Sequence, residues 1–393
     1  MTRFSSIFSQ LLQLFPRLEF EKAVKQHQAE RGAKGFGSWG QFVAMLFCQL
    51  GRAHSLREIC GGLASCEGKL KHLGVSEAPK KSTLAYANQH RPWELYQTVF
   101  GQLLGKCQSM VTESGFKKKF RFKNKLVSLD SSTIDLCLSL FDWAKFRRTK
   151  GAVKLHLLLD HDGYLPCYAV ITDGKKSDIR VARTMTFASG TVLVMDRGYN
   201  DYDWFYELTD QGVFFVTRMK DNAVYDVVEQ RGLPARGHVR GDAVIYFPSI
   251  AAKGKENFLR RIEVWDEEQQ RTLVFLTNHL TFGATTIAAV YKDRWKVELF
   301  FKAIKQNLKI KSFLGTSANA VHTQIWTALI AMLMLRYLQL KSTFAWSLSN
   351  LAALLRLQLF VYRDLHTWID SPFEAPPALE TIHDAQFVLN LAD

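Results

Sequence analysis

The sequence predicts a mixed α/β fold with a helical region on each side. Apolar segments of strand length, bounded by turn residues, occupy roughly residues 125–277. Segments with apolar residues on one helical face occupy about the first 110 residues and those from about 285 to 360. Strands that alternate with helices favour a sheet covered by helices. Hydrophobic residues make up 47% of the chain and charged residues 22%, which is typical of a globular protein.

The net charge of +14 favours a polyanionic partner such as nucleic acid, although a basic protein without such a partner has the same composition. Six cysteines form no CxxC pair, so we expect buried free thiols and a reducing, cytoplasmic location. No signal peptide is evident. The apolar stretch 325–340 is short and interrupted by Arg336, so we expect a core helix and no membrane partner.

Residues 1–115 are expected to form a helical N-terminal domain. One helix is predicted at about residues 40–50, and Ser55 followed three residues later by Glu58 forms a capping box that starts the next. Two short helices joined in this way resemble a helix-turn-helix, but any small helical bundle has the same pattern. DNA binding and a structural role both stay open. The candidate DNA contacts are Arg57, Lys69 and Lys71.

Beyond this region the chain changes from helices to strands. The basic run Lys117 to Lys125 is either a solvated charge run or a linker that contacts phosphate. The residues Asp-His-Asp-Gly at 160–163 are turn residues and predict a hairpin rather than a calcium loop. Strands are predicted at residues 125–130, 153–160, 164–172, 191–196 and 213–217, with helices at 177–187 and 202–209. The strand-like segments 244–250, 259–265 and 271–277 predict a β-rich insertion at about 222–275.

Two of the predicted strands end in an aspartate. Asp130 closes the segment KLVSLD, and Asp196 closes the segment TVLVMD. Side chains at strand ends of an α/β sheet project into a shared crevice, where a carboxylate is costly unless it is paired. Taken alone, each aspartate is as compatible with a cap or turn residue as with a metal ligand. Together on one sheet, the two aspartates favour a metal site.

A polar stripe marks the helix predicted from residue 291 to residue 310. At about 100° per residue, its four members fall within about 60° of one another. These members are Tyr291, Arg294, Glu298 and Lys305. Such a stripe suits a site that faces phosphate, and it is equally compatible with a solvated face on which Glu298 pairs with Lys302. Trp295, beside the stripe, is expected either to stack on an unpaired base or to pack in the fold.

These motifs together resemble the DDE transposases. Asp130 in LDSSTI, Asp196 in MDRGYND and the Y-x2-R-x3-E-x6-K pattern that begins at Tyr291 are similar to the insertion-sequence-four family. The resemblance covers about residues 125–311, and the N-terminal helices resemble an accessory domain of one subgroup. It implies an RNase H-like catalytic domain over residues 120–311, with the β-rich insertion inside it. A helical C-terminal region would follow at residues 312–393.

The resemblance also implies a site and an activity. Asp130, Asp196 and Glu298 would be the catalytic residues and the ligands of two Mg²⁺ ions, for which Mn²⁺ would substitute. The implied DNA contacts are Tyr291, Arg294, Trp295, Lys305 and Arg218. The implied activity is that of a transposase, which binds the terminal inverted repeats of a bacterial insertion sequence, cleaves its ends and joins the 3′-OH to target DNA.

The expected partner is double-stranded DNA, comprising the transposon ends and the target, and two copies of the chain would form a homodimer that holds both ends. The expected location is the cytoplasm, in association with the nucleoid. Two alternatives remain open at this point. One is a sequence-specific DNA-binding protein without catalysis, and the other is an RNase H-like nuclease that does not transfer strands.

Overall fold

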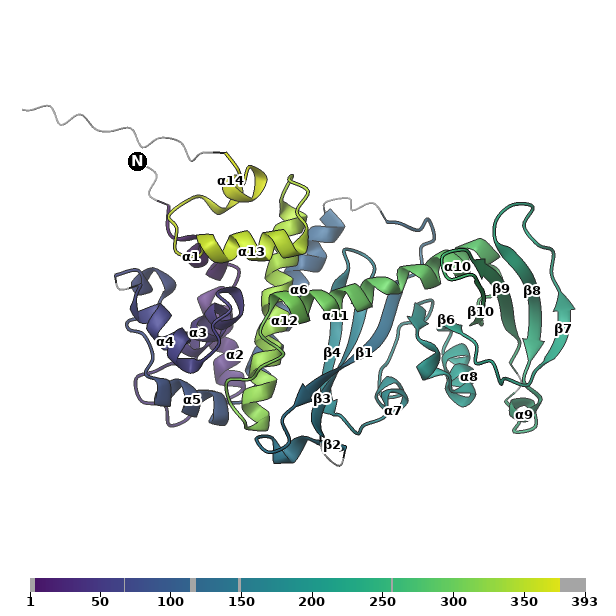
Figure 1. Cartoon of the computed structure of the whole chain (residues 1–393), viewed down its shortest axis with the longest axis horizontal. Coiled ribbons are helices and arrows are strands. Elements are labelled where there is room, and N and C mark those ends of the chain that lie inside the picture. The colour runs from purple at the N-terminus through teal and green to yellow at the C-terminus, as the bar shows by residue number, and fades with distance from the viewer. Residues whose placement is uncertain (1–3, 67, 114–117, 148–149, 256, 375–393) are drawn as a thin grey trace, which may run out of the picture.

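The structure is a computed structural model that describes residues 4–66, 68–113, 118–147, 150–255 and 257–374. Helices gather at one end of the molecule and a long twisted sheet fills the other, with helix α12 (Ala318–Lys341) at the boundary (Figure 1). The sheet has ten strands and is mixed. The predicted α/β class, with helices before and after the sheet, is therefore confirmed.

The RNase H-like part of the sheet has the spatial order β4, β3, β1, β5, β6. Strand β3 pairs antiparallel with both β1 and β4, whereas β5 lies parallel to β1 and β6 parallel to β5. The bounds are β1 Leu126–Leu136, β3 Lys150–Asp160, β4 Leu165–Asp173, β5 Val192–Met195 and β6 Phe214–Arg218, and the short strand β2 (Lys145–Arg147) also pairs with β3. The prediction that the first strand ends at Asp130 is wrong. Because β3 pairs with β1 as far as Leu136, Asp130 lies in mid-strand.

The β-rich insertion continues the same sheet instead of forming a sheet of its own. Its strands are β7 Asp226–Gln230, β8 Val239–Tyr246, β9 Leu259–Asp266 and β10 Arg271–Thr277. They form an antiparallel meander, which joins the RNase H-like part where β10 pairs with β6. The predicted strand 244–250 is wrong in its second half. Pro248, which has no N–H to give to a ladder, begins the short helix α9 (Pro248–Ala251).

Helices cover the two faces of the sheet. On one face, Leu129 and Leu193 share an apolar cluster with Phe205 of α8 (Tyr202–Asp210). The helix predicted at 177–187 lies on that face too, but it is only one short helix, α7 (Asp178–Ala182). On the other face lie α10 (Ala284–Asp293) and α11 (Trp295–Asn307), which follow one another end to end (Figure 1). The alternation of side chains along each strand thus decides which residues meet α11.

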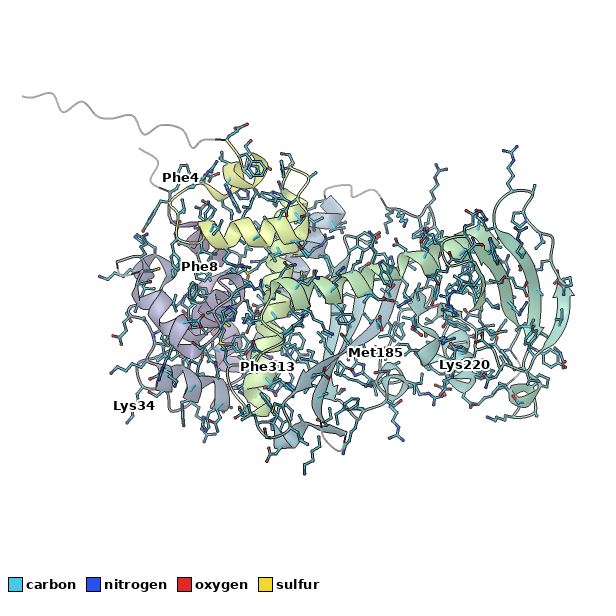
Figure 2. All side chains as sticks on the ribbon, viewed as in Figure 1. Phe4, Phe8, Lys34, Met185, Lys220 and Phe313 are labelled. Carbon is cyan, nitrogen blue, oxygen red and sulfur yellow. The ribbon has the colours of Figure 1, made fainter. Side chains whose placement is uncertain are left out.

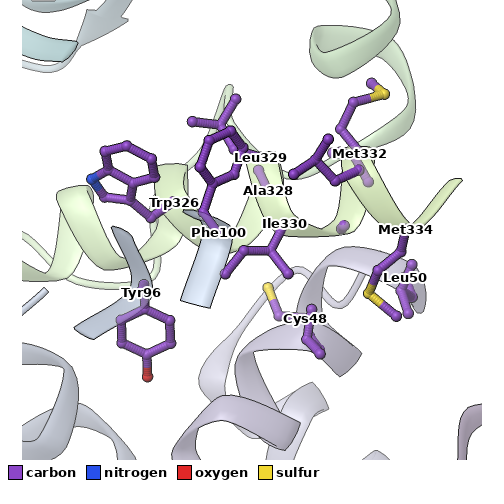
Figure 3. Packing of buried hydrophobic residues seen from close by; sticks show 14 of the residues in the cluster. Cys48, Leu50, Tyr96, Phe100, Trp326, Ala328, Leu329, Ile330, Met332 and Met334 are labelled. Carbon is purple, nitrogen blue, oxygen red and sulfur yellow. The ribbon is translucent and has the colours of Figure 1, made fainter. Parts of the chain in front are cut away.

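The N-terminal region is helical as predicted, and its helices share one core with α12. The bounds are α1 Ile7–Leu12, α2 Arg17–Gln26, α3 Ser38–Leu50, α4 Leu56–Ala64, α5 Lys81–His90 and α6 Glu94–Glu113. Figure 3 shows Trp326 and Ile330 of α12 beside Tyr96 and Phe100 of α6 and Cys48 of α3. The capping box is also present, because Ser55 Oγ accepts from the N–H of Glu58 at 3.1 Å.

Helix α12 corresponds to the apolar stretch predicted at 325–340. By length and composition it could cross a membrane, but 83% of its most apolar window is buried inside the protein. It is therefore the central helix of the core, and α13 (Leu348–Gln358) and α14 (Leu365–Asp370) follow it. Residues 375–393 of the predicted C-terminal region lie outside the described residues.

Most of the basic run predicted at 117–125 has structural partners. Its lysines at 118, 119 and 125 pair with carboxylates of β3, of the turn that follows it and of α10. The two phenylalanines pack together, and Phe122 also packs on Phe282, with ring centroids 4.7 Å apart. These contacts favour a structural connection over a phosphate-binding linker, while Lys117 lies outside the described residues.

Replacing Leu329 with alanine tests the core assignment of α12, because this side chain is 0% exposed. The reduced burial and the cavity left behind should lower the free energy of unfolding by about 2–5 kcal/mol. Urea denaturation followed by tryptophan fluorescence measures the change. The control is Leu357→Ala on α13, where the side chain is 71% exposed and the expected change is under about 0.5 kcal/mol. Equal decreases in the two variants would contradict the assignment.

Candidate active site

Parallel pairing of β1 with β5 brings the two predicted aspartates together. The register places Leu129 beside Met195, so that Asp130 and Asp196 occupy neighbouring positions one residue further along. Asp196 leaves the sheet at this point, and its Oδ1 accepts from the N–H of Gly198 at 2.9 Å. Oδ1 of Asp130 accepts from the N–H of Ser131 at 2.8 Å. Backbone donors thus orient both carboxylates.

Helix α11 supplies the third carboxylate, Glu298, in its first turn. The single helix predicted from residue 291 to residue 310 is wrong, because α10 ends at Asp293 and α11 begins at Trp295. Between them Arg294 keeps right-handed helical angles, with φ −52° and ψ −30°. The stripe of polar side chains therefore survives the break.

Arg294 joins the helix to the strand. Its Nη1 lies 3.4 Å from Oδ2 of Asp130, and its Nη2 donates to Oε1 of Glu298. The Arg294 side chain is only 9% exposed, so solvent screens both ion pairs weakly. At the far end of α11, Nζ of Lys305 donates to the backbone carbonyl of Thr133 at 3.1 Å, which fixes α11 along β1.

Burial, and to a smaller extent nearby negative charge, shifts the pKa of Asp130. Burial raises its pKa to about 6, and the charges of Glu298 and Asp196 push in the same direction. The N–H of Ser131 and the guanidinium of Arg294 oppose this shift. The three carboxylates therefore repel one another, which is the situation that a bound cation relieves.

The ligand chemistry of this cluster suits a hard cation such as Mg²⁺, since all three donors are carboxylate oxygens. Among the described residues, however, no three carboxylates, imidazoles or thiols lie close enough together to hold one ion. The guanidinium of Arg294 stands between Asp130 and Glu298 and supplies the positive charge there. The residues fit a metal ion chemically, provided that Arg294 moves away from at least one carboxylate.

The other predicted DNA contacts surround the cluster. Trp295 is 56% exposed, so the packing alternative for it is wrong. Tyr291 is half-buried, with its ring centroid 4.8 Å from that of Phe275 and 5.5 Å from the Arg294 guanidinium. Arg218 ends β6, and its charge acts on the Tyr291 hydroxyl. The structure thus places Tyr291, Trp295 and Arg218 near the start of α11, whereas Lys305 lies in its last turn.

Two surface grooves flank the carboxylates. One, of about 450 Å³, lies beside Asp196 and is lined by Arg197, Gly198, Lys220, Asp221 and Asn222, of which Lys220 is labelled in Figure 2. The other, of about 490 Å³, contains two of the carboxylates. It is lined by Asp130, Ser131, Ser132, Glu298, Phe301, Lys302, Lys305, Gln306 and Lys311. Sequence reasoning had missed Lys302 and Lys311 as part of the site.

Asp178 holds the far side of β1 in place. Its Oδ1 accepts from Ser131 Oγ at 3.0 Å and from Nζ of Lys154 at 3.1 Å. His156 is fully buried, and its Nε2 lies 2.9 Å from Thr172 Oγ1. These contacts give Lys154 and His156 a structural role next to Asp130 rather than in the groove.

A buried network that sequence reasoning missed fixes the start of α11. Ser128 Oγ lies 2.7 Å from Nε2 of His161, and Nδ1 of His161 lies 2.7 Å from Oδ2 of Asp293. A serine, a histidine and an aspartate in this order resemble a hydrolase triad, but all three are buried and neither of the two grooves includes them. Because Asp293 directly precedes Arg294, the network ties the helix junction to β1. No local spacing in the sequence signals it.

The chain is similar to known families and proteins over most of its length. A family model described as the transposase DDE domain matches residues 121–334, and one described as a domain of unknown function matches residues 3–76. A Sinorhizobium fredii protein assigned as transposase y4zB is 34% identical over 334 residues, which are 83% of this chain and 89% of that protein. A Geobacillus stearothermophilus protein assigned as the transposase of insertion sequence element IS5377 is 29% identical over 65% of this chain and 67% of its own length.

Among solved structures, a piggyBac transposase synaptic complex with hairpin DNA superimposes with a TM-score of 0.45 and 9% identity, over 96% of this chain and 84% of that one. The DDE-domain match spans more than half of the chain, and the Sinorhizobium relative is similar over most of it. The chain therefore belongs to the transposase DDE domain family. Membership implies a nuclease and transferase, and domains of this kind generally use divalent metal ions.

Asp293→Asn tests the network that fixes the helix junction. Burial raises the pKa of Asp293, but hydrogen bonds from His161 and Lys119 outweigh burial and lower it from 3.8 to about 2. The ionised carboxylate therefore stabilises the fold above about pH 4, and this stabilisation disappears as the pH falls to about 2. We expect the variant to be less stable by about 2 kcal/mol at neutral pH and by progressively less below about pH 4.

Urea denaturation of both proteins between neutral pH and about pH 2 measures this difference. Asp162→Asn is the matched control, because the ion pair of Asp162 with Lys118 is exposed and should contribute under about 1 kcal/mol. A destabilisation by Asp293→Asn that stays the same at every pH would contradict the ionised network.

Proposed function

We propose that this transposase binds the terminal inverted repeats of a bacterial insertion sequence, cleaves the DNA at the element ends and joins the freed 3′-OH to target DNA. The observation that carries the proposal is that Asp130 and Glu298, which Arg294 bridges, open onto a lysine-lined groove, while Asp196 lies beside Asp130 across the pairing of β1 with β5. A buried structural cluster would not open onto such a groove. Membership of the DDE family supports the same reading of the three carboxylates.

Asp130, Asp196 and Glu298 are proposed as the catalytic residues and as the ligands of two Mg²⁺ ions, with Mn²⁺ as a substitute. When bound, the ions supply an activated water or 3′-OH and neutralise charge on the attacking and leaving oxygens of an in-line displacement. The chain's own contribution is to orient the carboxylates. Backbone N–H groups of Ser131 and Gly198 hold the two aspartates, and the first turn of α11 holds the glutamate.

Arg294 is proposed to change partners during the reaction. In the structure it pairs with Asp130 and Glu298, both of which the metal ions would require. A guanidinium presents paired donors that match the oxygens of a phosphate as well as those of a carboxylate. We infer that it transfers to a phosphate of the bound DNA, next to Tyr291 and Lys305. The remaining proposed DNA contacts are Trp295 and Arg218.

The proposed partners follow from the reaction. Double-stranded DNA supplies the transposon ends and the target, and a homodimer is proposed because two ends must be held together for cut-and-paste transposition. The net charge of +14 is suited to a polyanionic partner of this kind. The proposed location is the cytoplasm, in association with the nucleoid.

Removing one carboxylate should separate DNA binding from chemistry. We expect Glu298→Gln to bind DNA that carries the terminal repeats within about threefold of the wild-type affinity, and to cut it at least about 1,000-fold more slowly with Mg²⁺. Glu268→Gln is the control, because Glu268 is an exposed acid that pairs with Lys292. Labelled duplex and a target plasmid allow cutting and joining to be scored together.

Each outcome of that assay has a definite meaning. Joined products from the wild type alone support the proposal. Cut ends that are never joined would indicate a nuclease without strand transfer, and binding without cutting would indicate a DNA-binding protein.

Trp295→Ala tests the role of the exposed ring. Stacking on an unpaired base contributes roughly 1–3 kcal/mol, so we expect the step that needs an extruded base to slow by about 5- to 150-fold. Trp295→Phe, which keeps a ring, should recover most of that rate. Because the side chain is exposed, the thermal unfolding midpoint should not change in either variant. A normal rate with alanine would contradict a stacking role.

A further inference from the structure

A line of basic side chains leads from the groove at Glu298 towards the N-terminal helices. It begins on α11, follows the connection between α11 and α12, and reaches the turn between α3 and α4 together with the facing side of α13. We call this set the basic track. It consists of Lys302, Lys305, Lys311, Lys309, Arg52 and Arg356.

Contacts between the elements make the basic track continuous. Nζ of Lys309 lies 2.8 Å from Nδ1 of His54, which joins the connection after α11 to the α3–α4 turn. The backbone N–H of Lys309 also donates to Oε1 of Gln49 at 2.8 Å. Helix α13, which carries Arg356, contacts both α11 and α3. Residues that are far apart in the sequence are therefore brought together, with the buried Lys309 as the link between the lysines of α11 and the arginine pair.

The basic track keeps like charges together. Burial lowers the pKa of Lys305, and the charge of Lys311 lowers it further against the opposing effect of Asp135. Burial likewise lowers the pKa of Arg356, and the charge of Arg52 adds to this. Within the described ranges, no residue of the basic track forms an ion pair with a carboxylate. Adjacent unneutralised cations of this kind are suited to an anionic partner.

The arginine pair at the far end has unused donors. The Nε atoms of Arg52 and Arg356 are buried and have no hydrogen-bond partner in the part of the chain that the structure describes. A buried donor without an acceptor is costly and therefore uncommon in folded proteins.

The backbone of Arg52 is unusual as well. It has φ 55°, in the left-handed region, although Gly51 beside it has φ −80°. An arginine therefore occupies the position that a glycine would fill without strain. Strained residues are often found where a side chain must be presented to a ligand.

We propose that the basic track binds the phosphodiester backbone of the duplex that leads away from the cleaved bond. A duplex carries one phosphate charge for about every 1.7 Å of its axis, so a line of lysines and arginines matches it without reading bases. The inference rests on the proposed function and adds a DNA path to it, from Glu298 across α11 and α13 to the N-terminal helices. It also gives these helices a backbone contact through Arg52.

Salt dependence of DNA binding tests the basic track. Neutralising one side chain that binds a phosphate should reduce the slope of log affinity against log salt by about 0.9, so neutralising two should reduce it by about 2. We expect this reduction in slope from the double variant Lys302→Gln with Lys311→Gln. We expect the same reduction, measured separately, from the double variant Arg52→Gln with Arg356→Gln. The matched control is Lys253→Gln with Arg236→Gln, which removes the same charge from the insertion and should keep the wild-type slope.

Shortening the duplex locates each pair of basic residues along the DNA. As base pairs are removed from the flank that leads away from the cut, the effect of the Arg52 and Arg356 substitutions should vanish first. The effect of the Lys302 and Lys311 substitutions should persist to shorter duplexes. Arg52→Lys with Arg356→Lys, which keeps the charge, should restore most of the slope and shows that the glutamine variant did not simply misfold.

Cleavage by the wild type in the same samples separates the two proposals. Suppose that the wild type cuts but that both glutamine double variants keep the wild-type salt slope, or that their effects vanish at the same duplex length. Either result would show that the basic track is wrong while the proposed function stands. If the slopes and lengths behave as expected but the wild type never cuts, the proposed function is wrong and the basic track stands as a DNA-binding surface.

Discussion

The double ion pair of Arg294 is the interaction on which the candidate active site depends. The guanidinium bridges Asp130 in the sheet and Glu298 on the helix that crosses it, in a place where solvent is mostly excluded. This positive charge separates the carboxylates of Asp130 and Glu298, which would otherwise repel each other. The same bridge holds α11 against β1 and keeps Glu298 on the side of the helix that faces Asp130. Arg294 therefore stabilises the fold and also occupies the site. Its ion pairs must break before the carboxylates can bind metal ions.

The backbone around this bridge is fixed by elements that do no chemistry themselves. Parallel pairing of β1 with β5 sets the two aspartates side by side. The buried Ser128–His161–Asp293 network anchors the junction immediately before Arg294, so the start of α11 has little freedom. A site built on a central strand and a packed helix is held more rigidly than one on loops. Movement of Arg294 can therefore be confined to its side chain.

Local patterns predicted most of the strands, the two aspartates and the polar stripe that contains Glu298, because each depends on residues that are near neighbours in the chain. The resemblance to DDE transposases joined the three carboxylates into one site. Features that depend on contacts between distant parts of the chain could not be predicted in this way. Asp130 was placed at a strand end because the pairing with β3 that extends β1 cannot be seen from its own segment. The break at Arg294 and the Ser128–His161–Asp293 network depend on tertiary contacts in the same way. The basic track combines elements from both ends of the chain, and no spacing rule links Arg52 to Arg356.

Replacing the 3′-bridging oxygen of the scissile phosphate with sulfur, in a duplex that carries an element end, tests whether the three carboxylates hold catalytic metal ions. Mg²⁺ prefers oxygen ligands, whereas Mn²⁺ accepts sulfur more readily. If the three carboxylates place a metal ion on the leaving oxygen, the wild type should cut the sulfur-containing duplex poorly with Mg²⁺ and recover with Mn²⁺. If the rate of cutting the sulfur-containing duplex, relative to unmodified DNA, is the same with Mg²⁺ and Mn²⁺, no metal ion contacts that oxygen. This result would contradict the role assigned to Asp130, Asp196 and Glu298.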